Sequence, residues 1–278
     1  MDRRVFFCVL LLTLSGCSLF AKPAPSLKGY TPVSDSMKAD VVAKLAQESA
    51  RITSARGSLR STFSKSLHRE TVRQIVVFQR PDKMRVELFA TSLNQLTLLA
   101  VSHDGLIEAY DPGAGVLFRG RDVPANIERV VSVPFSPEEL MLWFSGRVPF
   151  IEEEIEKVDV LEHKGGGRQA VRLLLKDGRR IEAEFTAGGA PHLVTLVLLG
   201  RKGSDPVFVS KTTYAPGGDV PQHASIQVSG ENIDGELEYE SFTLNPDLSS
   251  SRVPLFQIHV NSSMRIEDLD HDTTIQLP

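Results

Sequence analysis

The sequence predicts an α+β fold in which a large antiparallel sheet curls around a helical insertion. Over most of the chain, apolar and polar residues alternate with a period of two, as they do in strands that bury one face. Turn sequences such as Asp104-Gly105 and Asp177-Gly178 separate these runs at short intervals. Two stretches with helical spacing interrupt the series. We therefore expect one antiparallel sheet that is long enough to curl, with a helical insertion in the series of strands.

The amino terminus has the features of a secretory signal peptide. Arg3 and Arg4 supply a positive start, and the apolar run after them, residues 5–12, is too short to span a bilayer. The run ends in Leu14-Ser15-Gly16-Cys17, which resembles a lipobox. We therefore predict a signal peptide over residues 1–16, cleavage before Cys17, and acyl chains on the sulfur and amine of Cys17 that bind the protein to a membrane.

The composition after the signal peptide indicates a flexible tether and argues against a nucleic-acid partner and a disulfide. Residues 17–35, with several prolines and a glycine, predict a flexible tether. The first sixteen residues hold two arginines and one aspartate, so the remainder carries 29 Lys and Arg against 34 Asp and Glu. This negative balance argues against a nucleic-acid partner. Of the two cysteines, Cys8 lies in the signal peptide, so no disulfide is expected.

The folded body, residues 36–248, opens with a predicted amphipathic helix. Its cap is Asp35 or Ser36, and the helix is expected to end before Gly57. Its apolar face is formed by residues at three- and four-residue spacing, namely Met37, Val41, Leu45, Ser49 and Ile52.

Thirteen strands follow in two groups, one on each side of the helical insertion. The insertion contains a short turn or helix over residues 125–131 and a firmer helix from Ser136 to Gly146, where Pro137 takes the first helical position. The expected strands are 59–67, 71–80, 83–90, 95–103, 106–110, 116–121, 155–163, 169–176, 180–186, 192–199, 207–214, 224–228 and 235–244.

Some strands are apolar on one face and others on both. Met84, Val86 and Leu88 alternate with charged residues, whereas residues 96–101 place apolar side chains on both faces. Either packed segments cover the second face, or part of the sheet lines an apolar cavity that a ligand fills. The helix that includes residues 138–145 is also apolar on more than one side, so it is expected to be buried or to meet lipid.

The sequence offers little for catalysis. No pair among the seven histidines has a helical metal-ligand spacing, and neither a nucleophile elbow nor a phosphate-binding glycine loop is present. We expect no catalytic residues, no metal site and no cofactor. Glu152-Glu153-Glu154 is interpreted as a solvated charge run.

Two segments resemble the LolA/LolB family of lipoprotein-localisation proteins, and most closely its outer-membrane receptor, LolB. The first is Val77-Phe78-Gln79-Arg80-Pro81-Asp82 with the next strand, and the second is Leu140-Met141-Leu142-Trp143-Phe144-Ser145-Gly146-Arg147-Val148-Pro149. The resemblance implies a half-barrel of about eleven strands closed by helices, with a cavity for the acyl chains of other lipoproteins. The residues expected to line that cavity are Met84, Val86, Leu88, Leu96, Leu98, Leu140, Trp143 and Phe144.

The same resemblance implies a role in protein transport, as a receptor or chaperone that receives lipoproteins from a LolA-like periplasmic carrier. Leu93 occupies the loop at which the family inserts a leucine into the membrane. Ser18, in place of an aspartate after the lipidated cysteine, favours the outer membrane on its periplasmic side. A carrier of another lipid, and a scaffold or sensor that binds a protein partner, remain alternatives. Residues 249–278 are expected to form an extension, with a further strand near residues 256–260, or a tail.

Overall fold

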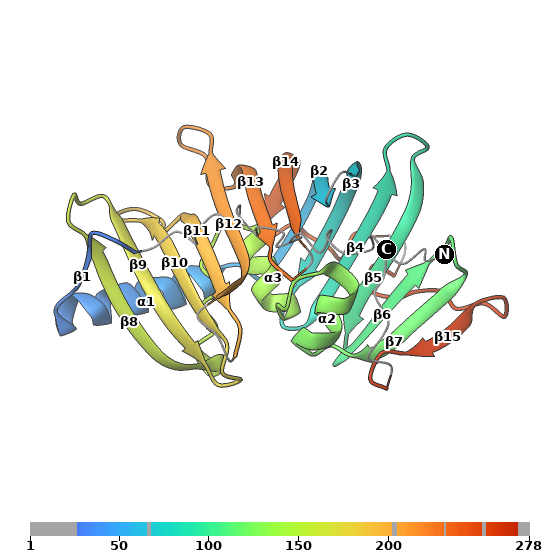
Figure 1. Cartoon of the computed structure of the whole chain (residues 1–278), viewed down its shortest axis with the longest axis horizontal. Helices are drawn as coiled ribbons and strands as arrows, with labels where there is room; N and C mark the ends of the chain where they lie inside the picture. The colour runs from blue at the N-terminus through green and yellow to red at the C-terminus, as the bar shows by residue number, and fades with distance from the viewer. Residues whose placement is uncertain (1–26, 66–67, 202–204, 231, 252–253, 272–278) are drawn as a thin grey trace, which may run out of the picture.

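The computed structural model describes residues 27–65, 68–201, 205–230, 232–251 and 254–271. Within these residues, fifteen strands form a single sheet in the order β1-β8-β9-β10-β11-β12-β13-β14-β2-β3-β4-β5-β6-β7-β15. Figure 1 shows it as one twisted and curled layer. The strands are β1 Tyr30–Pro32, β2 Ser54–Lys65, β3 His68–Gln79, β4 Lys83–Ala90, β5 Gln95–His103, β6 Leu106–Asp111, β7 Val116–Arg121, β8 Ile155–His163, β9 Arg168–Leu175, β10 Arg180–Thr186, β11 Leu193–Leu199, β12 Pro206–Tyr214, β13 Pro221–Val228, β14 Ile233–Leu244 and β15 Arg265–Asp268.

The predicted mostly-sheet α+β class is confirmed, but the expected strand number is wrong. The sheet has fifteen strands in place of about eleven. All thirteen strands that the alternation predicted are present, and the two outermost strands, β1 and β15, add to them. Both are short. They form only because longer neighbours, β8 and β7, offer free edges, which no local pattern in the sequence reveals.

Pairing of β14 with β2 joins the two groups of strands into one sheet. The two strands are antiparallel, with Leu237 opposite Ser61 and Phe242 opposite Gly57. Every neighbouring pair in the sheet is antiparallel except β15 and β7. The last long strand thereby returns beside the first, so the helical insertion between β7 and β8 lies against the middle of the sheet (Figure 1).

The amino-terminal helix, α1, spans Asp35–Arg51 and crosses the half of the sheet that contains β8. Its cap is Ser34, whose Oγ accepts a hydrogen bond from Met37 N at 3.4 Å, rather than Asp35 or Ser36 as predicted. The helix also ends six residues before Gly57. That glycine lies inside β2, where an added Cβ would come within 2.3 Å of the Phe242 ring. The residues just before Gly57 therefore belong to a strand that pairs with β3 and β14, and not to the end of the helix.

The helical insertion contains α2 (Pro124–Val131), α3 (Pro137–Phe144) and a short 3₁₀ turn, η1, at Glu152–Glu154. Both predicted helices are present. α2 lies beside β6, and α3 lies beside β3 and β4. We call the sheet face against which α3 packs the inner face, and the opposite face the outer face.

The segment after β14 covers part of the outer face. Phe256 and Ile258 pack on Val101 of β5 and Leu117 of β7. The backbone oxygen of Leu255 accepts a hydrogen bond from Arg85 Nη1 at 3.0 Å. A second layer of chain thus explains why residues 96–101 are apolar on both faces.

This carboxy-terminal segment then returns to the sheet edge. The extra strand forms at Arg265–Asp268 and pairs with β7, whereas residues 256–260 form no strand. Beyond β15, Leu269 is fully buried in the central core. Asp270 accepts a hydrogen bond from Asn126 Nδ2 of α2 at 2.8 Å.

Among the described residues, no helix is long and apolar enough to cross a membrane.

Candidate functional site

The helix α3 forms the centre of the inner face. A capping box begins it: Glu139 N donates to Ser136 Oγ at 3.2 Å, and Ser136 N donates to Glu139 Oε2 at 2.7 Å. Seven of its eight residues are buried, and only Glu138 is more exposed. The prediction that this helix is buried on more than one side is confirmed. A helix of this kind is held by its surroundings rather than by one amphipathic face.

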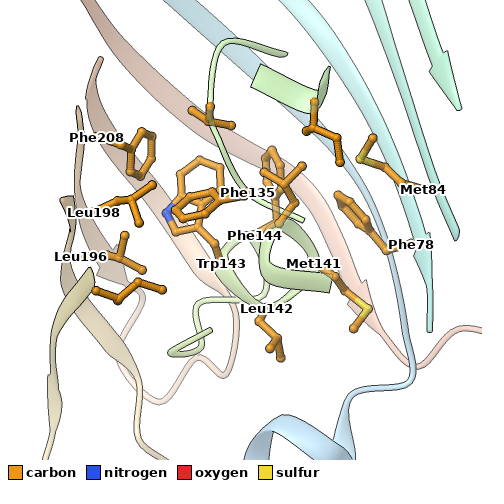
Figure 2. Packing of buried hydrophobic residues seen from close by; sticks show 14 of the residues in the cluster. Phe78, Met84, Phe135, Met141, Leu142, Trp143, Phe144, Leu196, Leu198 and Phe208 are labelled. Carbon is orange, nitrogen blue, oxygen red and sulfur yellow. The ribbon is translucent and has the colours of Figure 1, made fainter. Parts of the chain in front are cut away.

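Aromatic side chains connect α3 to both halves of the sheet. The ring centroid of Trp143 lies 4.6 Å from that of Phe144 and 5.4 Å from that of Phe208 in β12. Phe144 in turn lies 5.6 Å from Phe78 in β3. Trp143 Nε1 donates a hydrogen bond to Ser210 Oγ at 3.0 Å, which satisfies the polar atom of the indole inside the core. Figure 2 shows these rings gathered between the two halves of the sheet.

Seven of the eight residues expected to line a cavity belong to this one cluster. Six are buried and Leu88 is half-buried, and the cluster contains Met84, Val86, Leu88, Leu98, Leu140, Trp143 and Phe144. They contact one another as a packed core around α3. Entry of an acyl chain among them would therefore require side chains or the helix to move.

Leu96 is the residue that the structure does not bring to this cluster. A β-bulge interrupts the pairing of β4 with β5, so that Leu98 lies opposite Leu88 while Leu96 lies opposite Phe89. Phe89 follows Arg85 and Glu87 on the outer face. Leu96 is therefore on the outer face, because the bulge shifts the alternation by one residue.

The beginning of α3 carries a buried ion pair that the sequence did not indicate. Arg179 Nη1 lies 3.0 Å from Glu139 Oε2, and both side chains are more than nine-tenths buried. Arg179 Nε also contacts Asp177 at 2.6 Å. Burial raises the pKa of Glu139, and the guanidinium beside it acts in the opposite direction. The pair fixes α3 to the turn between β9 and β10.

A cleft of about 440 Å³ with several charged side chains in its lining opens beside this ion pair. It lies where the β3–β4 turn, the beginning of α3 and the β9–β10 turn meet, and Glu138, Glu154 and Asp177 contribute to its walls. Glu138 also pairs with Arg80 at 2.7 Å. Its lining differs from that of the apolar core.

Glu154 departs from the interpretation of Glu152-Glu153-Glu154 as a solvated run. Glu152 and Glu153 are exposed, but Glu154 is half-buried at the start of β8. Burial, and then the charge of Glu139, raise the pKa of Glu154 to about 7. The only local signal is its position immediately before an alternating strand.

A second polar network holds the end of α3. Gly146 adopts φ +70°, and an added Cβ there would lie 2.4 Å from the Tyr214 hydroxyl. That hydroxyl donates toward the backbone oxygens of Gly146 and Leu193, each at 2.9 Å. Arg147, the next residue, is 1% exposed and pairs with Asp219 in the β12–β13 loop. In the sequence, Arg147 was noted only as part of the segment that resembles the LolA/LolB family, and no role was predicted for it.

Leu93 lies at the tip of the hairpin between β4 and β5. It is 75% exposed, and no other large apolar side chain among the described residues is as open to solvent. The tip turns at Asn94, which adopts φ +48°. This position agrees with the loop location that the sequence predicted for it.

No protein-family model matches the chain, and no curated protein matches its sequence. Solved structures do match its shape. One is a domain named as an outer membrane lipoprotein-sorting protein from Vibrio parahaemolyticus, with a TM-score of 0.54 and 12% identity, covering 75% of this chain and 94% of that one. Another is a LolA superfamily protein from Nitrosomonas europaea, with a TM-score of 0.51 and 8% identity, covering 73% and 93%.

The chain has a LolA-like fold. A DUF1329 family protein from Desulfovibrio piger is similar to the same degree, with a TM-score of 0.54, 11% identity and coverage of 77% and 95%. Because these identities are low, the likeness concerns the fold, and fold alone does not decide function.

The remaining expectations concern the anchor and metals. Cys17 and Ser18 lie outside the described residues. In the part of the chain that the structure describes, no group of three or more His, Cys, Asp or Glu side chains is arranged to hold a metal ion.

Proposed function

We propose that this LolA-like protein is an outer-membrane lipoprotein that binds acyl chains on its inner face and inserts other lipoproteins into the membrane. The observation that carries the proposal is the LolA-like fold combined with an apolar cluster on the inner face. The lipobox at Cys17 supports a membrane anchor. The likeness to a lipoprotein-sorting domain supports lipoproteins as cargo.

The physical requirement for such a receptor is a balance of affinities. Each acyl methylene left in water costs about 0.8 kcal/mol, so a lipoprotein cannot cross an aqueous compartment with its chains unshielded. The receptor must cover these chains and then lose them to the bilayer. In the proposed cycle, a LolA-like carrier supplies the lipoprotein, the region around Trp143 and Phe144 shields the chains, and the anchor keeps the receptor beside the membrane.

Leu93 is proposed to contact the bilayer during delivery. An exposed leucine at a hairpin tip can enter the headgroup region at little cost, whereas a glutamate there would be repelled. Leu93→Glu is therefore expected to reduce delivery several-fold and to leave acceptance of cargo unchanged. The assay is transfer of a purified lipoprotein from a soluble periplasmic carrier to this protein and then to lipid vesicles.

Leu106→Glu is the matched control. Leu106 is also exposed in a hairpin, but it lies at the β5–β6 turn, at the other end of β5. If both variants deliver as well as the natural protein, Leu93 has no membrane role. If neither the natural protein nor a variant accepts cargo, the receptor function itself is wrong.

The tight packing around α3 favours a second candidate function. A scaffold or sensor that binds a protein partner needs no cavity, and six of the predicted cavity residues are already buried against one another. Native mass spectrometry of the purified chain distinguishes the two functions. Bound lipid, or uptake of an acylated probe, supports transport of lipoproteins or of another lipid, and the lack of both supports the scaffold.

A further inference from the structure

Two polar side chains are buried on the inner face without a hydrogen-bond partner. Ser61 is 0% exposed and its Oγ has no partner, and Gln74 is 8% exposed and its Oε1 has none. Buried polar atoms are almost always paired, because an unpaired one loses its bonds to water and gains nothing in return. Each therefore needs an explanation.

Strand register places these two side chains together on the inner face. Ser61 lies in the cross-strand row Leu237–Ser61–Val72–Ala90, and Gln74 lies in the next row, Tyr239–Leu59–Gln74–Leu88–Leu98. They occupy adjacent strands at a diagonal position, where backbones are roughly 7–8 Å apart. Apart from them and the Tyr239 hydroxyl, the side chains of both rows are apolar.

Other buried serines on the same face do find partners. Ser102 Oγ donates to Asp82 O at 2.9 Å, and Ser210 Oγ accepts from Trp143 Nε1 at 3.0 Å. Ser61 and Gln74 differ in position, since they lie between the core around α3 and the hairpin tip that carries Leu93. The side chains next to them on the tip side, Phe63 and Ala90, are half-buried, so this end of the face is more open.

The chemistry of the two atoms restricts what can pair with them. Gln74 Oε1 only accepts, so its partner must bring an N–H or O–H, and the Ser61 hydroxyl is free to donate to a carbonyl. A secondary amide carries both groups, whereas an ester carries no donor. The surrounding rows are suited to a hydrocarbon chain attached to such a group.

We infer that Ser61 and Gln74 bind the amide of an N-acyl chain, with Ser61 donating to its carbonyl and Gln74 Oε1 accepting from its N–H. The inference rests on the proposed function, because it assumes that acyl chains bind the inner face. It adds a preference for amide-linked over ester-linked chains. The chain itself extends along the apolar rows toward Val76 and Val86, which are buried, so core side chains or α3 must move to admit it.

The test compares two probes that differ in one hydrogen-bond donor. N-palmitoylglycine has an amide N–H, and N-palmitoylsarcosine has the same chain and carbonyl with a methyl group on the nitrogen. The purified full chain is expected to bind the glycine compound roughly tenfold more tightly, measured by titration calorimetry. Gln74→Met, which keeps the side-chain length, is expected to abolish this preference, and Ser61→Ala is expected to weaken binding of both probes.

Ser64→Ala is the control, because Ser64 lies on the same strand but on the outer face. Neither Ser61→Ala nor Gln74→Met should impair folding, since each removes an unpaired atom, and thermal unfolding checks this. Equal affinity of the natural protein for both probes overturns the inference and leaves acyl binding intact. Failure to bind either probe overturns the proposed function as well.

Discussion

Arg147 and Asp219 form an ion pair in which the guanidinium is fully buried and the carboxylate is half-exposed. Arg147 Nη1 also donates to the backbone oxygen of Asp219 at 3.0 Å and to that of Ser145 at 3.2 Å. Asp219 further contacts Arg51 of α1 at 3.6 Å and His192 at 3.3 Å. One loop carboxylate thus joins the end of α3, the end of α1 and the β10–β11 connection.

Asp219→Asn is expected to lower the free energy of unfolding by about 2 kcal/mol, because it removes the nearer of two carboxylates from the buried Arg147 and leaves only Glu48, at 3.7 Å. Chemical denaturation measures the change. Asp159→Asn is the matched control: Asp159 also pairs with a cation, Lys157, at 3.4 Å, but both side chains are exposed, so its effect should stay within about 0.5 kcal/mol. Similar small losses in both variants would mean that the buried network does not hold α3 in place.

The raised pKa of Glu154 leads us to expect that the free energy of unfolding falls as pH rises. Its pKa is about 7 in the folded protein against an ordinary value of 4.5, so the folded state binds more protons between these values. The stabilising contribution is complete below about pH 4.5 and is lost as pH rises through 7. Glu139, Arg179, Glu138 and Asp177 are the charged groups that act on it.

Glu154→Gln removes this dependence. We expect the variant to unfold at a higher temperature than the natural protein at pH 8, and at nearly the same temperature at pH 5, as followed by circular dichroism. Glu153→Gln changes an exposed neighbour on the same 3₁₀ turn and should behave alike at both pH values. A Glu154→Gln effect that is equal at pH 5 and pH 8 would contradict the raised pKa.

A substitution at Gly120 tests how firmly the carboxy-terminal segment is bound to β7, because this glycine packs closely against Leu269. A Cβ on this residue of β7 would lie 2.8 Å from Leu269 Cβ and 3.0 Å from Asn126 Nδ2. Gly120→Ala is therefore expected to displace Leu269, to cost about 1–3 kcal/mol, and to speed amide hydrogen exchange in β15. Gly230→Ala serves as the control, because nothing lies within 4 Å of its added Cβ. Unchanged exchange in β15 would show that the segment is held by other contacts.

Much of the secondary structure could be predicted from local patterns. Alternation located thirteen strands, and the Ser136-Pro137 start and the apolar run to Phe144 located α3. The loop position of Leu93 was predicted from the resemblance to the LolA/LolB family, and the structure shows the residue exposed there. These features depend on residues a few positions apart, and the sequence displays such neighbours directly.

What only the tertiary structure decided depends on residues far apart in the chain. Glu139 meets Arg179 and Arg147 meets Asp219 across 40 and 72 residues, and the carboxy-terminal segment reaches Val101 and Leu117 from still farther along the chain. The bulge that turns Leu96 to the outer face leaves no mark in the alternation.

The sequence by itself determined where the helices and thirteen of the fifteen strands form, because backbone geometry and side-chain period are local. Burial, pairing and pKa depend on which distant surfaces come together when the sheet curls. For that reason, the buried and unpaired state of Ser61 and Gln74, and the raised pKa of Glu154, emerged only from the folded chain.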